Sequence, residues 1–412
     1  MLAVLLAAGE SSRFYPYNDL GHKSLVTLCG KKLIVHTLDS LRESNIKNVI
    51  IVENKNRSVS KSLSVSDTKG LSVKFIVQDS PAGMGEAVLL CKPYIKETFF
   101  LLNAYHFEFS EVAKELLKIS KKGYLALLTK EEKNAKEFGS VELKNGKMVI
   151  SEKKNSEAKD RIVGIYCLPV AFLDVLEKEK KDHYSFESAL TSFSQTNRIE
   201  LVQTKKETLS LKYPWDILSI KDYMLERLKK HKGKGVTISK RAVLHGEVYI
   251  DDGATIMDGA VITGPCYIGK NAYIGTNSIL RGGSLIEEKV VVGAGLEVKN
   301  SVLMKGVKTH SGFIGDSLVG ENTKVAAGYN SANVRLDKEN VKVKVKGEYV
   351  STGRKYFGAI IGSGVSFGIR VGTMPGVVIG NNDLIGPGTT VMQNLEDNIT
   401  YYTEIKGVIT KR

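Results

Sequence analysis

The second half of the chain carries a six-residue repeat, which restricts the fold more than any other feature of the sequence. Stepping by six from Ile238 to Met304, every position holds an aliphatic residue or methionine. A short fixed period is typical of a solenoid, in which each repeat packs on its neighbours. We expect three hexapeptides per triangular turn, with these side chains pointing inward. They are Ile238, Leu244, Ile250, Ile256, Ile262, Ile268, Ile274, Leu280, Ile286, Val292, Val298 and Met304.

Small residues recur between the aliphatic ones, for example Ala254, Ala260 and Ala272, and we expect Gly and Asn at the corners. This pattern resembles the left-handed parallel β-helix of hexapeptide-repeat proteins. The phase resumes at Ile361 and continues to Val391. Between residues 329 and 357 the repeat is interrupted, and there the alternation of Val and Lys over Val341–Gly347 predicts a hairpin arm with one basic face.

The first half has a different rhythm, in which strand-like and helix-like segments alternate. Apolar runs predict strands, and the spacing of Leu33–Leu41 predicts a helix. Such βαβ alternation indicates an α/β domain with a mostly parallel, Rossmann-like sheet. A basic segment, Ile220–Lys232, predicts a further helix before a Gly-containing boundary, so we expect domains at 1–230 and 231–412. The expected strands are Leu2–Leu6, Asn48–Val52, Val73–Val77 and Phe99–Leu102.

Composition narrows the class of partner. The chain has 59 Lys and Arg against 45 Asp and Glu, a net charge of +14 that is dispersed, which favours a small anionic ligand over nucleic acid. Its 4 Cys form no CxxC pair, so neither a zinc site nor a disulfide framework is indicated. The apolar start lacks the basic region of a signal peptide, and no apolar run approaches the roughly 20 residues of a membrane span. We expect a cytoplasmic protein that binds no membrane.

A small-residue turn follows the first expected strand, in the sequence Leu6-Ala-Ala-Gly-Glu-Ser-Ser-Arg-Phe14. Backbone N–H groups in such a turn can approach phosphates, and Arg13 and Lys23 add positive charge. Together with Gly30-Lys-Lys-Leu-Ile34 and later motifs, this order resembles the sugar-1-phosphate nucleotidylyltransferases. The resemblance implies nucleotide binding by Ala8, Gly9, Arg13, Lys23, Gln78 and Gly83, and sugar binding by Gly139 and Glu152.

The same resemblance implies Mg²⁺ on two aspartates, but Tyr105 and Ser210 stand at the corresponding positions. Neither is a good magnesium ligand. Three explanations remain open. The domain has lost its transferase activity, or it uses substitute ligands such as His106, Glu108 or Asp216, or the two motifs are aligned in the wrong register.

His310 falls six residues after Met304, where the inward ladder predicts another aliphatic side chain. Its surroundings, Lys308–Ser317, resemble a segment of glucosamine-1-phosphate N-acetyltransferase domains. The resemblance implies that His310 is the general base that deprotonates the sugar amine attacking acetyl-CoA. Imidazole suits this role because it gains and loses a proton near neutral pH.

The resemblance also implies the remaining contacts of this site. Phe313 stands where the family has a tyrosine, and Lys338 is an alternative to Lys342 as the lysine of the arm. The family forms homotrimers, with acetyl-CoA between neighbouring β-helices. Implied contacts of the hexosamine phosphate are Arg281, Lys299, Phe313, Asn333 and Lys342, and implied contacts of acetyl-CoA are Ala327 and Gly386.

Taken together, the motifs predict a bifunctional sugar-1-phosphate nucleotidylyltransferase/acetyltransferase that acetylates the amine of a hexosamine-1-phosphate. The activity of its nucleotidylyltransferase half is in doubt. One alternative is a fully bifunctional enzyme that also makes a nucleotide-sugar such as UDP-N-acetylglucosamine and releases pyrophosphate. Another is a non-catalytic N-terminal domain that binds nucleotide as a sensor or scaffold.

Overall fold

The structure, a computed structural model, describes residues 1–131, 139–144, 147–151, 160–404, 407 and 410. They form two compact units. The first comprises Met1–Ser11, Leu20–Val26 and Lys31–Ser210, and the second comprises Ser12–Asp19, Thr27–Gly30 and Leu211–Arg412. Two short loops from the beginning of the sequence are therefore part of the C-terminal unit.

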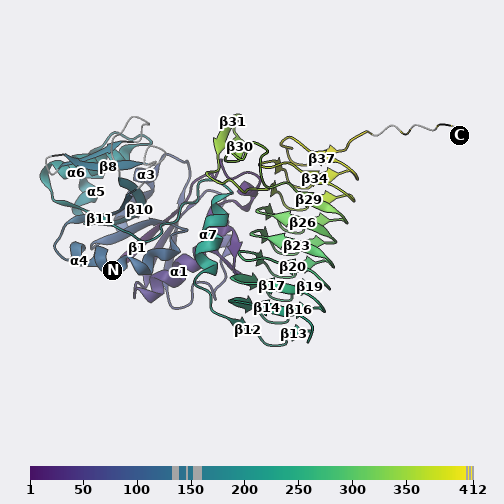
Figure 1. The fold of residues 1–412 in the computed structure, drawn as a ribbon. Coiled ribbons are helices and arrows are strands. Elements are labelled where there is room, and N and C mark those ends of the chain that lie inside the picture. Colours follow the sequence, from purple (N-terminus) through teal and green to yellow (C-terminus); the bar gives the residue numbers. More distant parts are fainter. Residues whose placement is uncertain (132–138, 145–146, 152–159, 405–406, 408–409, 411–412) are drawn as a thin grey trace. The chain divides into compact units, whose positions relative to one another are not determined.

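The first unit is built on one twisted sheet with strand order β11-β7-β10-β6-β1-β4-β5 (Figure 1). All neighbours on this path are parallel except β10, which runs antiparallel to β6 and β7, and the hairpin β8–β9 extends from β10. The strands are β1 (Leu2–Ala7), β3 (Lys31–Lys32), which lies outside this sheet, β4 (Asn48–Asn54), β5 (Ser72–Gln78), β6 (Phe99–Asn103), β7 (Leu125–Glu131), β8 (Ser140–Lys144), β9 (Lys147–Ser151), β10 (Asp160–Leu168) and β11 (Ile199–Gln203).

Helices cover both faces of this sheet, because strands buried on both sides need an apolar layer on each. Alternate residues of β1 point to opposite cores: Val4 packs in the core with α3, α5 and α6, and Leu5 packs in the core with α1 and α4. The expected strands and the expected helix after Lys32 are confirmed. The helices are α1 (Leu33–Glu43), α2 (Ser58–Ser62), α3 (Met84–Cys91), α4 (Ala113–Ser120), α5 (Ala171–Lys178) and α6 (Ser185–Thr196).

The second unit is the left-handed parallel β-helix that the hexapeptides predict, with three sheets that each take every third strand (Figure 1). One sheet contains β12 (His231–Lys232), β15 (Val248–Ile250), β18 (Cys266–Ile268), β21 (Leu285–Ile286), β24 (Val302–Leu303), β27 (Leu318–Val319), β32 (Ile360–Ile361) and β35 (Val378–Ile379). The next contains β13 (Thr237–Ile238), β16 (Thr255–Ile256), β19 (Tyr273–Ile274), β22 (Val291–Val292), β25 (Lys308–Thr309), β28 (Lys324–Val325), β33 (Ser366–Phe367), β36 (Leu384–Ile385) and β38 (Thr400–Tyr401). The third contains β14 (Val243–His245), β17 (Val261–Thr263), β20 (Ile279–Leu280), β23 (Leu296–Lys299), β26 (Gly312–Gly315), β29 (Tyr329–Ser331), β34 (Gly372–Thr373) and β37 (Thr390–Val391).

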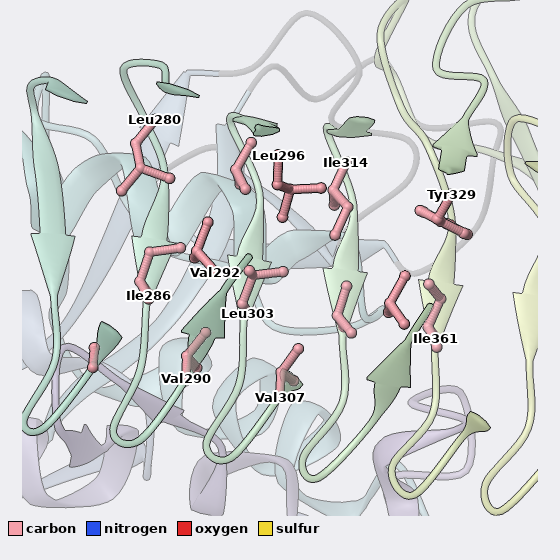
Figure 2. Packing of buried hydrophobic residues seen from close by; sticks show 14 of the residues in the cluster. Leu280, Ile286, Val290, Val292, Leu296, Leu303, Val307, Ile314, Tyr329 and Ile361 are labelled. Atoms are coloured by element: carbon pink, nitrogen blue, oxygen red, sulfur yellow. The ribbon is translucent and has the colours of Figure 1, made fainter. Parts of the chain in front are cut away.

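The predicted aliphatic ladder forms the core of the β-helix. Leu280, Ile286 and Val292 point inward from the three sheets, and each inward side chain stacks on its counterpart in the next coil, as Ile286 does on Leu303 (Figure 2). The register is 18 residues per coil in the first coils, as between Ile268 and Ile286. Then the coils shorten. Ile286 pairs with Leu303, 17 residues on, and Leu303 pairs with Val319, 16 residues on.

This shortening corrects two sequence predictions. The ladder passes through Leu303 and Thr309, so Met304 and His310 each lie one residue beyond the inward position. Met304 is still buried, but His310 is exposed. The six-residue step fails here because a hexapeptide has lost one residue at the corner near Asn300, whose φ is +47°. His310 therefore lies on the outside of the β-helix, where a substrate can reach it.

The arm is confirmed as a hairpin, with β30 (Lys342–Val345) antiparallel to β31 (Glu348–Ser351). Val341 and Val343 are buried, whereas the intervening lysines are exposed, which produces the predicted basic face. The helix expected over Ile220–Lys232 is instead α7 (Asp216–Leu225), because His231–Lys232 already forms the first strand of the β-helix. In the part of the chain that the structure describes, no helix is both long and apolar enough to cross a membrane.

Candidate functional site

The first unit contains a cavity of about 350 Å³ where β1 and β6 end. These strands are parallel neighbours, so Leu6 and Asn103 meet at the same edge of the sheet. Ligands of doubly wound sheets bind at this edge. The cavity brings together five of the six residues predicted to bind nucleotide, namely Ala8, Gly9, Lys23, Gln78 and Gly83.

Two details shape this cavity. Gly83 has a φ of +102°, and a Cβ there would lie 2.7 Å from the carbonyl oxygen of His183, so only glycine fits. The Gln78 amide donates to the Gly83 carbonyl at 3.1 Å and to Glu86 at 2.6 Å. The glutamine is thereby oriented before any ligand arrives.

The sixth predicted nucleotide residue, Arg13, is placed differently. It belongs to the segment Ser12–Asp19, which is part of the second unit, and its side chain is exposed. There it lines a cavity of about 550 Å³ together with Trp215 and Lys346.

The charge in the first cavity is modest. Of the described residues that line it, one is a lysine, Lys23, and one a carboxylic acid, Glu187. Burial, together with the neighbouring charge of Lys23, lowers the pKa of His22 to about 3, so this imidazole is neutral. The Lys23 ammonium lies 5.1 Å from the centre of the Tyr105 ring, within the range of a cation–π interaction.

The residues present do not fit a magnesium site. Tyr105, at a position where the resemblance expects a carboxylate, is 8% exposed and lies beneath Lys23. Ser210 is half-buried. Magnesium prefers an octahedral shell of oxygen ligands. No group of three or more His, Cys, Asp or Glu able to hold a metal occurs among the described residues.

Two of the proposed substitute ligands, His106 and Glu108, contact each other. His106 Nδ1 and Glu108 Oε1 are 2.9 Å apart, and both side chains are buried. Glu108 also accepts from the backbone N–H of Leu209 at 3.1 Å. Asp216 instead accepts from the N–H groups of Lys212 and Tyr213 and belongs to the second unit.

The predicted sugar contacts of the first unit are only partly described. Gly139 is half-buried, and its carbonyl accepts from Ile162 N–H at 2.8 Å. Glu152 lies outside the described residues. Gly164 and Tyr166 also line the cavity.

The third sheet of the β-helix carries a second group of polar side chains, on successive coils. Arg281 and Lys299 follow each other at one register position, because Arg281 N–H donates to Val298 C=O. Arg281 pairs with Glu297 at 2.9 Å, and Lys299 pairs with Asp316 at 2.9 Å. Two predicted phosphate ligands therefore lie side by side, each held by a carboxylate.

Two more predicted residues join this group. Asn333 Nδ2 donates to Asp316 at 2.6 Å. A Cβ on Gly315 would lie 2.5 Å from the Phe313 ring and 2.9 Å from Asn333 Nδ2, so these side chains meet above that glycine. The Lys299 ammonium also lies 4.6 Å from the centre of the Tyr356 ring.

His310 lies at the corner between this sheet and the one that contains β25. Its N–H donates to Val325 C=O at 2.9 Å, and its side chain is exposed. The chain enters β26, which carries Phe313, two residues later. The backbone therefore fixes the corner, while the imidazole extends outward.

The remaining predicted residues are more scattered. Lys342 is exposed on the arm, and Ala327 and Gly386 are half-buried on other coils. A Cβ on Gly386 would lie 2.6 Å from Tyr402 Cβ, so the position requires glycine. Asp316, Glu297 and Tyr356 were not predicted. Only the sequence neighbourhood of His310 pointed toward Asp316.

A sheet with a Gly-lined cavity at its edge, followed by a hexapeptide β-helix with a cationic site, defines a two-domain transferase. Residues 2–229 match the family model described as "Nucleotidyl transferase".

Relatives cover the whole chain. The "Bifunctional protein GlmU" of Methanocaldococcus jannaschii is 33% identical, over 98% of this chain and 97% of its own. That of Methanococcus vannielii is 32% identical over the full length of both. The "Bifunctional sugar-1-phosphate nucleotidylyltransferase/acetyltransferase" of Sulfurisphaera tokodaii is 31% identical, over 96% of this chain and 98% of its own. The chain belongs to this family of bifunctional transferases.

Proposed function

We propose that the protein transfers the acetyl group of acetyl-CoA to the amine of a hexosamine-1-phosphate at the β-helix site. The observation that carries this proposal is the pair Arg281 and Lys299 on successive coils, with Lys299 linked to Asn333 through Asp316; His310 is exposed on the same β-helix. Two cations side by side suit a phosphate. The exposed imidazole suits the deprotonation of an amine.

In the proposed reaction the amine nitrogen attacks the thioester carbonyl carbon. A C–N bond forms and the C–S bond breaks. His310 takes one proton from the attacking nitrogen, and the coenzyme A thiolate leaves and takes up a proton. Arg281 and Lys299 bind the phosphate through reaction, so they contribute to substrate binding in the ground state as well as in the transition state.

The N-terminal unit, in this proposal, binds a nucleotide but does not release pyrophosphate. Pyrophosphate release by this fold requires charge neutralisation at the phosphates. The cavity offers Lys23, whereas Tyr105 occupies an expected carboxylate position. This supports the sensor or scaffold alternative over the fully bifunctional one.

The assembly and the domain limits belong to the same proposal. We propose a cytoplasmic homotrimer formed through the β-helix, with acetyl-CoA bound between protomers near Ala327 and Gly386 and with Lys342 reaching from the arm. Large apolar side chains exposed on the β-helix support an interface; they include Ile369, Met374, Leu384 and Met392. We retain 1–230 and 231–412 as functional domains.

One experiment tests both halves of the proposal. The purified protein is assayed with acetyl-CoA and glucosamine-1-phosphate, and separately for pyrophosphate release with Mg²⁺, each nucleoside triphosphate and several hexose-1-phosphates. We expect acetylation without pyrophosphate. Pyrophosphate at enzymatic rates would establish the fully bifunctional alternative, and absence of acetylation with any hexosamine phosphate would refute the main proposal. Light scattering of the same sample tests the trimer.

A further inference from the structure

A single carboxylate organises the β-helix site. Asp316 follows β26, and its side chain is 3% exposed. Its Oδ2 accepts from Lys299 Nζ at 2.9 Å and from Asn333 Nδ2 at 2.6 Å. Its Oδ1 accepts from Asn300 Nδ2 at 2.7 Å. Two residues expected to bind the amino-sugar phosphate thus share one oxygen of one buried group.

Asn300, which donates to the Asp316 carboxylate, is itself fixed by a lysine. Asn300 Oδ1 accepts from Lys221 Nζ at 2.7 Å, and Lys221 also donates to Gly283 C=O at 2.6 Å. The Lys221 side chain is fully buried. Because a cation fixes the oxygen end of the Asn300 amide, its NH₂ must face Asp316. The orientation of Asp316 is therefore set by a chain of contacts that begins on α7.

Lys299 keeps the capacity to bind a ligand. An ammonium carries three N–H donors, and the bond to Asp316 uses one. The ring of Tyr356 confines a second side of the group, with its centre 4.6 Å from Nζ. The side chain remains 25% exposed. A lysine held in this way loses little rotamer freedom when a phosphate arrives.

We propose that Asp316 is a positioning residue of the acetyl-transfer site, which holds Lys299 and Asn333 at a fixed separation for the amino-sugar phosphate. This inference rests on the proposed function. It predicts that Asp316 acts on the binding of the sugar phosphate, not on the chemical step at His310 and not on the binding of acetyl-CoA.

The test is Asp316→Asn, which is isosteric. The φ of Asp316 is +50°, a conformation that asparagine tolerates well. The variant replaces one acceptor with an NH₂ that faces the donors of Asn300 or of Lys299 and Asn333. We expect KM and Kd for glucosamine-1-phosphate to rise about tenfold to a hundredfold, as for a lost charge-assisted contact. We expect kcat to change less than about threefold and KM for acetyl-CoA to stay constant.

The matched control is Asp383→Asn, a fully buried aspartate of the same β-helix that accepts from Ile399 N–H at 2.7 Å. It should leave both KM values unchanged. If Asp316→Asn does not fold, Asn300→Asp is the second test of the inference. It replaces the NH₂ group that donates to Asp316 with a carboxylate, which repels Asp316. It should shift KM for the sugar phosphate in the same direction.

The outcomes separate this inference from the proposed function. If the wild type acetylates and neither variant changes KM or Kd for the sugar phosphate, the inference alone is wrong. If the wild type does not acetylate but binds glucosamine-1-phosphate by calorimetry, and Asp316→Asn weakens that binding, the proposed function is wrong and the inference stands. If the wild type neither acetylates nor binds, both are wrong.

Discussion

The cavity of the sheet and the polar face of the β-helix differ in the groups that contact their positively charged side chains. In the cavity, Lys23 lies over the ring of Tyr105 and the neighbouring His22 is neutral. On the β-helix, Arg281 and Lys299 are each fixed by a carboxylate. A carboxylate fixes the position of the cation that it pairs with, so the β-helix cations are preorganised for an anionic ligand. The comparison shows that ion pairs fix the two cations of the β-helix face, whereas the lysine of the cavity packs against an aromatic ring.

The largest effect that this comparison predicts comes from removing the proposed general base. His310→Ala should lower acetyl transfer by about 10²–10⁴-fold, because a positioned proton acceptor contributes that much. The measurement is steady-state thiol release from acetyl-CoA. His245→Ala is the control, since His245 is also exposed on the β-helix. Equal rates for the two variants would remove His310 from the mechanism.

Removal of one ladder side chain should destabilise the β-helix strongly. Leu280 is fully buried in the core, whereas its neighbour Ile279 is 42% exposed. Leu280→Ala should lower the free energy of unfolding by about 2–5 kcal/mol through lost burial and a cavity. Ile279→Ala should cost far less. Denaturant unfolding of both variants checks this, and similar losses would mean that the inward direction is misassigned.

A buried acid should make stability depend on pH. Glu287 is 1% exposed and accepts from the N–H of Gly30, and burial raises its pKa to about 8. The folded state then holds a proton that the unfolded state loses above about pH 4.5. Stability is therefore complete below that pH and falls by roughly 1.4 kcal/mol per unit as pH rises toward 8.

Glu287→Gln should abolish this slope while keeping an acceptor for the N–H. Its stability relative to the wild type should therefore increase from pH 5 to pH 8, as measured by urea unfolding at each pH. Glu288→Gln is the control. The hydrogen bond from Lys305 lowers the pKa of Glu288, so that residue titrates only in acid. Parallel curves for wild type and Glu287→Gln would show that Glu287 is ionised in the folded protein.

The smallest predicted effect concerns the cavity of the sheet. Lys23→Ala should weaken nucleoside triphosphate binding about tenfold, the usual loss for one charged hydrogen bond. Exposed Lys61→Ala, in the same unit, should have no effect. Because Tyr105 and Ser210 stand at the two expected carboxylate positions, EDTA should change the affinity little in calorimetry. Binding that disappears with EDTA would show that a metal site exists after all.

The sequence predicted the architecture well because the six-residue repeat and the alternation of strand-like and helix-like segments are both local patterns. Every ladder position from Ile250 to Val298 lies in the core. The slip after Val298 could not be predicted, because Leu303 and Met304 are both apolar and satisfy either phase. The same slip placed His310 wrongly, although its role had been assigned from its neighbours in sequence.

The candidate site was predicted only in part, because contacts between coils have no local signature. Lys299 and Asn333 were identified from motifs. Asp316, which joins them, is separated from each by 17 residues. Arg13 shows the converse limit: it is near Gly9 in sequence, but its loop belongs to the other unit. The packing of loops and coils decides which of these residues meet, and the spacing of residues in the sequence does not reveal that packing.

The shortened coils show that the number of residues between two inward side chains can change along one β-helix. Before Asn300 the inward side chains are six residues apart, whereas the steps from Val298 to Leu303 and from Thr309 to Ile314 are five residues, so Thr309 faces inward and His310 faces outward. A single residue inserted between Asn300 and Leu303 would lengthen the step from Val298 to Leu303 from five residues to six, so Leu303 and Thr309 would still point inward and His310 outward. The corners of this β-helix can therefore lose residues while the inward ladder, and with it the fold, stays the same.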